Sequence, residues 1–577
     1  MRNNSRFWVF NAPLKERLSL AELLRGDLLA LLLIIVYMLL LAPYSLNFIF
    51  YMPDERHYAD AAMYMLKHGG YLSPINPDGG YRFLKPIFTY WVVLASYALF
   101  GISEFSTRFP FLLAAGMVIW LTYRTTLLAF KSRETALLAL LIVGATPLLH
   151  RSTPLALTDL LFLLFLQLII YGTVGLLVSA DRKPRFFWYL YAGAGMAVMT
   201  KGLPAVVFLC VALLYLVANP WKRSQLIALL HFPAMIAGLV FGVFWYVAIF
   251  FMHGPEAVFS FWNDQVGIRV SDKLLQIARN LLLSVVVIVL MMFPFMLTGW
   301  RSLFYQLNLK KNGKVLVVFG FALVWLLAMI GMASFVSKFY YRYFIPVLPV
   351  LAMAMAWLIW SVGQKSGTLK MLRVGLIIAF TLLLLVNLSG FFVARLFYAP
   401  TWYYAVFSCT ILVSFCLFLK NGRKSILHQS ILIYCFMAGI FFCLYFVIQP
   451  ISSPTNGQQI AQKLEELNIS SNDSIQFFGH TRIASNFRVV TKGEYFLKAY
   501  KIEESKVKSE TRIVIVPDNF VEELNLDNFD LVPASYVWAE ISPNEIWKVK
   551  SRKEFLELKK KRSDIYYIGI RKSSKKD

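Results

Sequence analysis

Residues 28–50 read LLALLLIIVYMLLLAPYSLNFIF, and this stretch decides the class of fold. It carries no charged side chain, and a helix of about 20 such residues crosses the hydrocarbon core of a bilayer. Comparable apolar runs recur over the first 450 residues, and 58% of the 577 residues are hydrophobic. Soluble domains are only about 45–50% apolar. The sequence therefore predicts a membrane protein with many spanning helices.

Segment length and flanking residues divide the region 1–450 into about 13 predicted crossings. The predicted spans are 28–50, 105–128, 135–150, 154–178, 187–200, 203–219, 226–251, 279–300, 315–336, 342–362, 373–396, 403–419 and 428–450. We therefore expect an α-helical polytopic membrane domain over residues 1–450.

Basic residues in the short loops predict the orientation of these spans. The N-terminal segment is rich in Arg and Lys, and every second loop after it carries Lys or Arg, for example Lys131, Arg133, Lys222 and Arg223. Such loops stay in the cytoplasm. Residues 51–104, 252–278, 337–341 and everything after about 451 then face outward. The net charge of +25 is explained by this topology and by anionic lipid, so we expect membrane lipids and no nucleic acid as partners.

The outer segment 51–104 is too long for a simple connection. Residues 55–67 predict a short helix that ends at Gly69-Gly70. Residues 86–101 are apolar but short, which favours an interfacial helix.

From Ile451 onward the composition becomes that of a soluble domain. The pattern predicts a helix over 458–467 and strands over 474–478, 512–516 and 564–570. We expect a small extracytoplasmic α/β domain over residues 451–577.

Charged and phenolic side chains gather at the predicted outer ends of the spans. A carboxylate there can act as a general base, and Lys or Arg can hold a phosphate. Each also has a simpler explanation: Asp54 as a helix cap, Lys85 as a head-group contact, Asp159 as the partner of Arg151 or His150, Lys201 as a snorkelling lysine. The candidates are Asp54, Glu55, Arg56, Arg82, Lys85, Asp159, Lys201, Arg269, Arg342 and Tyr343.

The loop 252–278 adds His253, Glu256, Asp264 and Arg269. The spacing of His253 and Glu256 suits two ligands of one metal, but two ligands alone are a weak signal, and solvated loop residues have the same pattern. The joint placement of the candidates is stronger: all lie on the predicted outer face and mix carboxylates with cations. Such a site suits an anionic, lipid-linked substrate.

Several motifs together resemble a known family. Pro53-Asp54-Glu55-Arg56-His57-Tyr58-Ala59, followed by Lys85-Pro86 and Tyr90-Trp91, is similar to the opening of the lipid-phosphate-dependent GT-C glycosyltransferases, in particular the lipid A aminoarabinose transferases. Later landmarks also look like those of this family. They are Ser103 to Arg108, Leu157-Thr158-Asp159, Thr200-Lys201-Gly202 and Tyr341 to Pro346.

The resemblance implies an inverting transfer of one sugar, such as an amino sugar, from undecaprenyl phosphate to a lipid A phosphate. The protein would lie in the bacterial inner membrane with its site and C-terminal domain in the periplasm. Asp54 matches the catalytic acidic position, and we add Asp159 as a second catalytic candidate. The expected donor-phosphate contacts are Lys85, Arg269, Arg342, Tyr343 and Lys201. Glu55, Arg56 and Arg82 are expected to contact the acceptor or to serve the site in another way.

One departure from the family concerns metal binding. Leu84 stands where the aminoarabinose transferases have Glu, and Gln265 stands near the position of their metal-binding histidine. Leucine cannot bind a divalent metal, so a structural zinc of the family's type is not expected. No cofactor is assigned, a divalent metal stays open, and a changed sugar preference is compatible with the sequence.

Alternative functions share some of these features. The same chemistry could serve a protein or another glycan as acceptor, and aminoarabinose, galactosamine, galacturonic acid and mannose remain open as the sugar. A transporter of lipid-linked sugars would also need many spans, but transporters tend to show paired repeats with broken helices, and this sequence shows no repeat.

Overall fold

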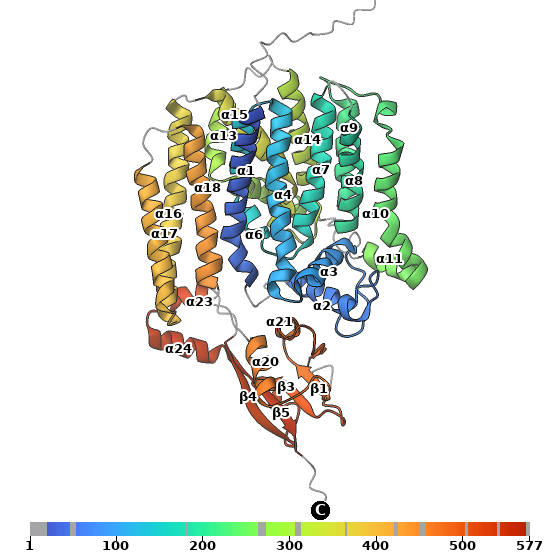
Figure 1. Cartoon of the computed structure of the whole chain (residues 1–577), viewed down its shortest axis with the longest axis vertical. Coiled ribbons are helices and arrows are strands. Elements are labelled where there is room, and N and C mark those ends of the chain that lie inside the picture. The colour runs from blue at the N-terminus through green and yellow to red at the C-terminus, as the bar shows by residue number, and fades with distance from the viewer. Residues whose placement is uncertain are drawn as a thin grey trace, which may run out of the picture.

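A bundle of long helices is stacked on a small sheet domain in the computed structural model (Figure 1). The structure describes residues 20–46, 53–179, 183–263, 273–305, 313–363, 366–420, 425–449, 456–501, 506–538 and 543–572.

The helices of the bundle follow one another through residue 448. They are α1 (Leu20–Leu41), η1 (Ala42–Leu46), α2 (Pro53–His68), α3 (Phe88–Phe100), α4 (Glu104–Phe130), α5 (Arg133–Gly144), α6 (Pro147–Ser152), α7 (Thr158–Val178), α8 (Pro184–Lys201), α9 (Leu203–Ala218), η2 (Leu226–Leu229), α10 (Phe232–His253), α11 (Pro255–Trp262), α12 (Leu274–Met291), α13 (Phe295–Tyr305), α14 (Gly313–Ser334), η5 (Tyr341–Val347), α15 (Leu348–Val362), α16 (Ser366–Leu396), α17 (Thr401–Leu419), α18 (Ile426–Phe442) and η6 (Cys443–Ile448).

Ten helices of the described chain are long and apolar enough to cross a membrane. The polytopic helical architecture is thus confirmed, whereas the predicted number of crossings stays a prediction. Three predicted spans are interrupted, and one of them, 226–251, is split into η2 and α10 just before Pro233. The span 135–150 is split into α5 and α6 before Pro147, and the span 279–300 into α12 and α13 around Pro294. Proline lacks the N–H that a helix interior requires, which explains why a helix begins or ends at each position.

The outer segment contains the two short helices that the sequence predicts. Helix α2 ends before Gly69 and Gly70, both with φ of +77°, a conformation that glycine adopts without strain. Its predicted apolar face, which includes Tyr58, Ala62 and Met65, is buried. Helix α3 has 13 residues, too few to cross a bilayer. Both helices lie at the end of the bundle that faces the sheet domain (Figure 1).

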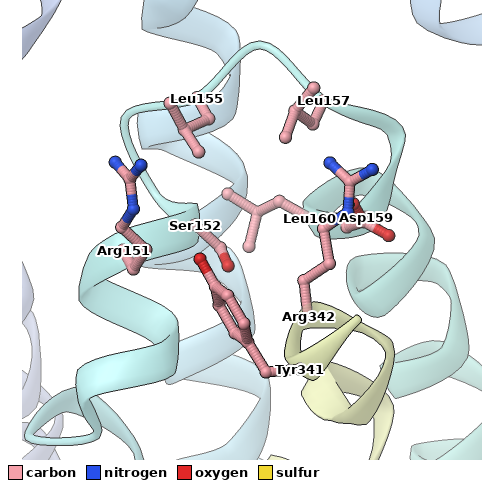
Figure 2. A pocket seen from close by; sticks show the side chains of 8 residues that line it. All are labelled: Arg151, Ser152, Leu155, Leu157, Asp159, Leu160, Tyr341 and Arg342. Carbon is pink, nitrogen blue, oxygen red and sulfur yellow. The ribbon is translucent and has the colours of Figure 1, made fainter. Parts of the chain in front are cut away.

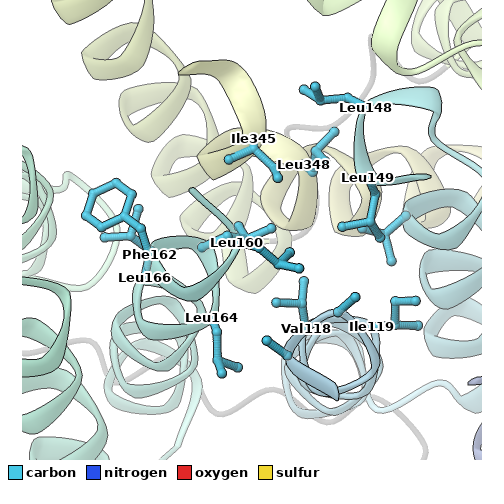
Figure 3. Packing of buried hydrophobic residues seen from close by; sticks show 14 of the residues in the cluster. Val118, Ile119, Leu148, Leu149, Leu160, Phe162, Leu164, Leu166, Ile345 and Leu348 are labelled. Carbon is cyan, nitrogen blue, oxygen red and sulfur yellow. The ribbon is translucent and has the colours of Figure 1, made fainter. Parts of the chain in front are cut away.

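Helix α7 occupies the centre of the bundle. Leu160 and Leu164 of α7 pack near Val118 of α4, Leu149 of α6 and Ile345 of η5 (Figure 3). A helix that is apolar on all sides is stable only when neighbours surround it or lipid does, and α7 is surrounded by protein. Its N-terminal residues Thr158 and Asp159 are therefore held rigidly at the end of the bundle nearest to α2.

The C-terminal part forms a five-stranded sheet in the order β2-β1-β3-β5-β4. Strand β1 is parallel to both β2 and β3, and β5 is antiparallel to both β3 and β4. The predicted strands and the helix over 458–467 are found within two residues, while β2, β4 and the other helices were not predicted. The elements are α20 (Asn456–Glu466), β1 (Ile475–Phe478), α21 (Thr481–Val490), β2 (Ala499–Tyr500), β3 (Ile513–Pro517), α22 (Asp518–Val521), β4 (Phe529–Trp538), α23 (Pro543–Lys548), α24 (Arg552–Lys561) and β5 (Ser563–Arg571).

Helix α21 docks the sheet domain on α2 through buried polar contacts. The Arg488 guanidinium donates from Nε and Nη2 to the two Asp60 carboxylate oxygens, at 3.0 and 2.7 Å. Ser485 Oγ donates to Asp60 Oδ1 at 3.0 Å, and Asn486 Nδ2 donates to Glu104 Oε1 at 3.1 Å. Because Asp60 lies on the same helix as Asp54, the sheet domain is mechanically connected to the candidate catalytic residue.

Candidate active site

A polar cavity of about 290 Å³ lies where α2, α7, α8 and η5 meet. Residues far apart in the sequence share its wall. Five cations and two carboxylates are among the lining residues, so the cavity is electropositive and suited to an anion. The lining residues are Asp54, Arg82, Leu84, Lys85, Leu157, Thr158, Asp159, Lys201, Val336, Ser337, Lys338, Tyr340, Arg342 and Tyr343.

Asp54 reaches the cavity from the first turn of α2, and its side chain is 38% exposed. The next residue, Glu55, points the other way and is fully buried. Arg108 of α4 donates to Glu55 from Nε at 3.0 Å and from Nη2 at 3.4 Å, and the Ala156 backbone N–H donates to it at 3.0 Å. Glu55 therefore anchors α2 to the bundle. The prediction that Glu55 contacts the acceptor is corrected by this burial.

Asp159 lies at the start of α7 and forms ion pairs with two cations. Lys201, the last residue of α8, donates to Asp159 Oδ1, and Arg342 Nε lies 3.7 Å from Asp159 Oδ2. Figure 2 shows the Arg342 guanidinium beside Asp159, with Arg151 on the other side of the small pocket. The ion-pair partners of Asp159 are thus Lys201 and Arg342. The alternative prediction, that Asp159 pairs with Arg151 or His150, was wrong.

Arg342 connects the two candidate catalytic carboxylates. Its Nη2 lies 3.5 Å from Asp54 Oδ2, while its Nε faces Asp159. The guanidinium has several donors in one plane, so a single side chain can orient both acids. An anion that enters the cavity would meet a cation already fixed in position.

Lys201 is also held between aromatic rings. Its Nζ lies 5.2 Å from the ring centre of Phe162 and 5.4 Å from that of Tyr343. Such cation–π contacts stabilise an ammonium in a partly dry site. Tyr343 therefore lines the cavity beside Lys201. Both residues belong to the predicted set of donor-phosphate contacts.

An apolar groove of about 430 Å³ adjoins the polar cavity and shares three lining residues with it, Lys201, Val336 and Tyr343. The remaining wall is mostly aliphatic and aromatic, with Phe162, Phe208 and Met332 among its residues. A polar pocket that continues into an apolar groove fits an amphipathic ligand with an anionic head and a hydrocarbon tail.

Other predicted residues lie elsewhere. Arg56 hydrogen-bonds to Thr481 of the sheet domain and faces a different cavity, whereas Arg82 lines the central one. Arg269, Asp264 and Gln265 lie outside the described residues. His253 Nε2 is 2.7 Å from Ser73 Oγ, and its ring packs on Tyr81 and Phe83. His253 therefore packs against the segment around Ser73 and Tyr81.

Lys338, which belongs to the same basic and phenolic stretch as Arg342 and Tyr343, also lines the central cavity. The structure adds a role for Arg108, which fixes Glu55 next to Asp54. An arginine inside an apolar span was the available signal, because a charge there must have a partner.

No metal-binding group assembles around the cavity in the described part of the chain. Leu84 lines the cavity and offers no ligand atom, and no three His, Cys, Asp or Glu side chains of the described residues come together.

The chain is similar in sequence and in fold to several known proteins. Residues 84–248 match the family model described as dolichyl-phosphate-mannose-protein mannosyltransferase. The chain is 28% identical to the undecaprenyl phosphate-alpha-4-amino-4-deoxy-L-arabinose arabinosyl transferase of Pectobacterium carotovorum over 216 residues, which cover 37% of this chain and 38% of that enzyme. It is 26% identical to an uncharacterized protein of Aquifex aeolicus over 360 residues, 62% of this chain and 68% of that protein.

The fold matches that of a solved enzyme along nearly its whole length. The crystal structure of ArnT from Cupriavidus metallidurans bound to undecaprenyl phosphate superposes with a TM-score of 0.66 at 16% identity, over 93% of this chain and 97% of that one. The aligned part spans only about two fifths of the aminoarabinose transferases matched by sequence.

The fold defines the class: a polytopic helical membrane protein with the fold of the ArnT crystal structure. Within that fold, about two fifths of the chain is similar in sequence to aminoarabinose transferases.

Proposed function

We propose that this protein is an inverting glycosyltransferase that moves a single sugar, such as an amino sugar, from undecaprenyl phosphate to a phosphate of lipid A at the periplasmic face of the inner membrane. The observation that carries the proposal is the electropositive cavity that opens into an apolar groove. The donor has the matching shape, with a phosphate head and a polyprenyl tail.

The cavity can stabilise the departing phosphate. As the bond between the sugar and the carrier phosphate breaks, the bonding electron pair goes to the phosphate oxygen and negative charge grows there. Lys85, Lys201 and Arg342 line the cavity and are held by other groups before reaction, so they need not reorganise when the charge develops. Removing one such preorganised donor typically slows a reaction by about 10²–10³-fold.

Asp54 is positioned to act on the acceptor. It is the more exposed of the two carboxylates in the cavity, at 38% against 7% for Asp159. A phosphate acceptor is already ionised, so it needs orientation more than deprotonation. If a hydroxyl attacks instead, Asp54 accepts its proton. Asp159 is paired with two cations, so we assign it the role of fixing Lys201 and Arg342.

Sidedness follows from the charge pattern of the loops. Helices α2 and α3 and the sheet domain lie at one end of the bundle (Figure 1), and Asp54 of α2 lines the central cavity. The positive-inside rule supports the assignment of that end to the outside of the cytoplasm. Alkaline phosphatase fused after residue 449 should be active and a cytoplasmic reporter fused there inactive. The reverse pattern would refute the periplasmic site.

Mass spectrometry of lipid A tests donor and acceptor together. Cells with the wild-type protein should carry an added pentosamine or hexosamine on lipid A phosphate, and cells with Asp54→Asn at equal protein level should lack it. Unmodified lipid A beside a newly glycosylated protein or glycan would move the proposal to that acceptor. No transfer to any acceptor, with net movement of the lipid-linked sugar across vesicles, would refute the enzyme in favour of a transporter.

A further inference from the structure

A second cavity, also of about 290 Å³, lies between α2 and the sheet domain. Among the residues that the structure describes, none lines both this cavity and the central one. Its wall is made by the start of α2, the segment around Asn76, and α21 with β2 of the sheet domain. The lining residues are Arg56, His57, Asp60, Asn76, Pro77, Asp78, Thr481, Arg488, Lys498, Ala499 and Lys501.

Positive charge dominates this interdomain cavity. Four lysines and arginines line it against two aspartates, and one of the aspartates, Asp60, is neutralised by its bidentate pair with Arg488. Burial lowers the pKa of Arg56, Asp60 raises it, and the nearby Arg82, Arg482 and Arg488 lower it further. Cations gathered this closely repel one another unless an anion lies among them.

His57 adds a neutral hydrogen-bonding group to the same wall. Burial lowers the pKa of His57 to about 3, and the neighbouring Arg82 and Arg56 lower it as well. The imidazole is therefore uncharged at neutral pH, with one nitrogen able to donate and one able to accept. Cations beside a neutral imidazole and Asn76 suit a ligand that carries both anionic and hydroxyl oxygens.

The interdomain cavity lies next to the reacting centre. Asp54 faces the central cavity, while Arg56 and His57, two and three residues later on the same helix, face the second one. At a rise of 1.5 Å per residue these positions are separated by only about 3–5 Å along the helix axis. Arg82 lines the central cavity and also acts electrostatically on Arg56 and His57.

A transferase that joins two lipid-linked molecules needs two binding sites that meet at one point. The apolar groove leads into the central cavity past Lys201 and Tyr343, so the carrier lipid occupies that approach. The interdomain cavity offers an approach from the other side of α2, and its polar wall suits a head group.

We propose that the interdomain cavity binds the phosphorylated saccharide head group of the acceptor, and this rests on the proposed function. Lys498 and Lys501 of the sheet domain, together with Arg56 of α2, contact the phosphate. His57 contacts a sugar hydroxyl. The sheet domain thereby forms half of the acceptor site.

Binding of a water-soluble probe to the full-length protein tests the assignment. The probe is the diphosphorylated glucosamine disaccharide of lipid A without acyl chains, titrated calorimetrically against protein in phosphatidylcholine nanodiscs. Lys498→Gln with Lys501→Gln should weaken probe binding about 10-fold or more, because two charge-assisted hydrogen bonds to the phosphate are lost. The matched control, Lys492→Gln with Lys508→Gln, removes the same charge from the sheet domain outside both cavities and should bind normally.

Undecaprenyl phosphate binding separates this proposal from the proposed function. The Lys498/Lys501 variant should bind undecaprenyl phosphate normally, whereas Lys85→Gln should weaken undecaprenyl phosphate and leave the probe unaffected. Failure of undecaprenyl phosphate to bind the wild type would count against the proposed function alone. An unchanged probe affinity in the Lys498/Lys501 variant, or no binding of the probe to the wild type, would overturn the acceptor site. So would loss of probe binding when phosphatidylglycerol is added to the nanodiscs, since the cavity would then hold a phospholipid head group.

Discussion

The buried ion pair between Asp60 and Arg488 predicts that the sheet domain keeps α2, and with it Asp54, in place. The two side chains are 4% and 3% exposed, and both carboxylate oxygens accept from the guanidinium, at 3.0 and 2.7 Å. Removing one partner leaves the other charge buried and uncompensated, which costs about 3–5 kcal/mol. Asp60→Asn and Arg488→Met are the two perturbations, because both replacements nearly preserve side-chain volume.

Each single variant should loosen the docking of α21 on α2. A loss of about 3 kcal/mol raises the population of the undocked state about 100-fold. Hydrogen exchange followed by mass spectrometry in nanodiscs would detect this as faster exchange of the amides of α2 and α21. Transfer activity should fall in parallel, because Asp54 belongs to the loosened helix.

The double variant and a surface control make the test specific. Asp60→Asn combined with Arg488→Met leaves no uncompensated charge, so its cost should be about 1–3 kcal/mol less than the sum of the two single costs. The control is Lys463→Met in α20, whose ion pair with Glu466 is exposed and contributes about 1 kcal/mol or less. Unchanged exchange of α2 in both single variants, or additive costs in the double variant, would refute the reasoning.

Three further predictions address the donor site, the groove and the pH response. Asp54→Asn should lower transfer by about 10²-fold, the cost of a misplaced acceptor, with undecaprenyl phosphate binding retained; near-normal turnover would remove Asp54 from catalysis. Gly331 lines the apolar groove, and a Cβ built there meets no atom within 4 Å, so the groove has room for a larger side chain. Gly331→Trp should therefore weaken binding of the full-length carrier more than binding of a two-isoprene analogue, both measured by competition. Equal effects on the two ligands would place the carrier tail outside the groove. Because the folded-state pKa of His57 is about 3 and the unfolded value about 6.5, its contribution to stability is present above pH 6.5 and is lost as the pH falls toward 3. His57→Gln should therefore flatten the decline of the melting temperature between pH 6.5 and 4, and a decline identical to the wild type would contradict the burial of a neutral imidazole.

Much of the central site could be predicted from the sequence because membrane topology restricts where polar residues can lie. Charged residues at the ends of apolar spans must lie near an interface, and alternation of basic loops assigns each end to one side. Asp54, Lys85, Asp159, Lys201 and Arg342 were grouped by this reasoning, and all five line one cavity.

The pairing of these residues could not be predicted. The ion pair of Lys201 with Asp159 joins positions 42 residues apart, and that of Arg488 with Asp60 joins positions 428 apart. Which charges meet depends on how the helices are arranged around α7, and no local pattern encodes that arrangement. The role of Glu55 was missed for the same reason, since its partner Arg108 belongs to another helix.

The start of α2 shows how a few consecutive residues can serve several sites at once. Successive residues of a helix are rotated by about 100°, so Asp54, Glu55 and Arg56 must point in three directions. Asp54 faces the central cavity, Glu55 faces Arg108 of the bundle, and Arg56 faces the interdomain cavity. Asp60 follows Arg56 by four residues, a spacing that returns to nearly the same face, and it lines the same interdomain cavity. A rotation of α2 about its axis would therefore displace Asp54 from the central cavity, Glu55 from Arg108 and Arg56 from the interdomain cavity at the same time. The buried ion pairs of Glu55 with Arg108 and of Asp60 with Arg488 oppose such a rotation.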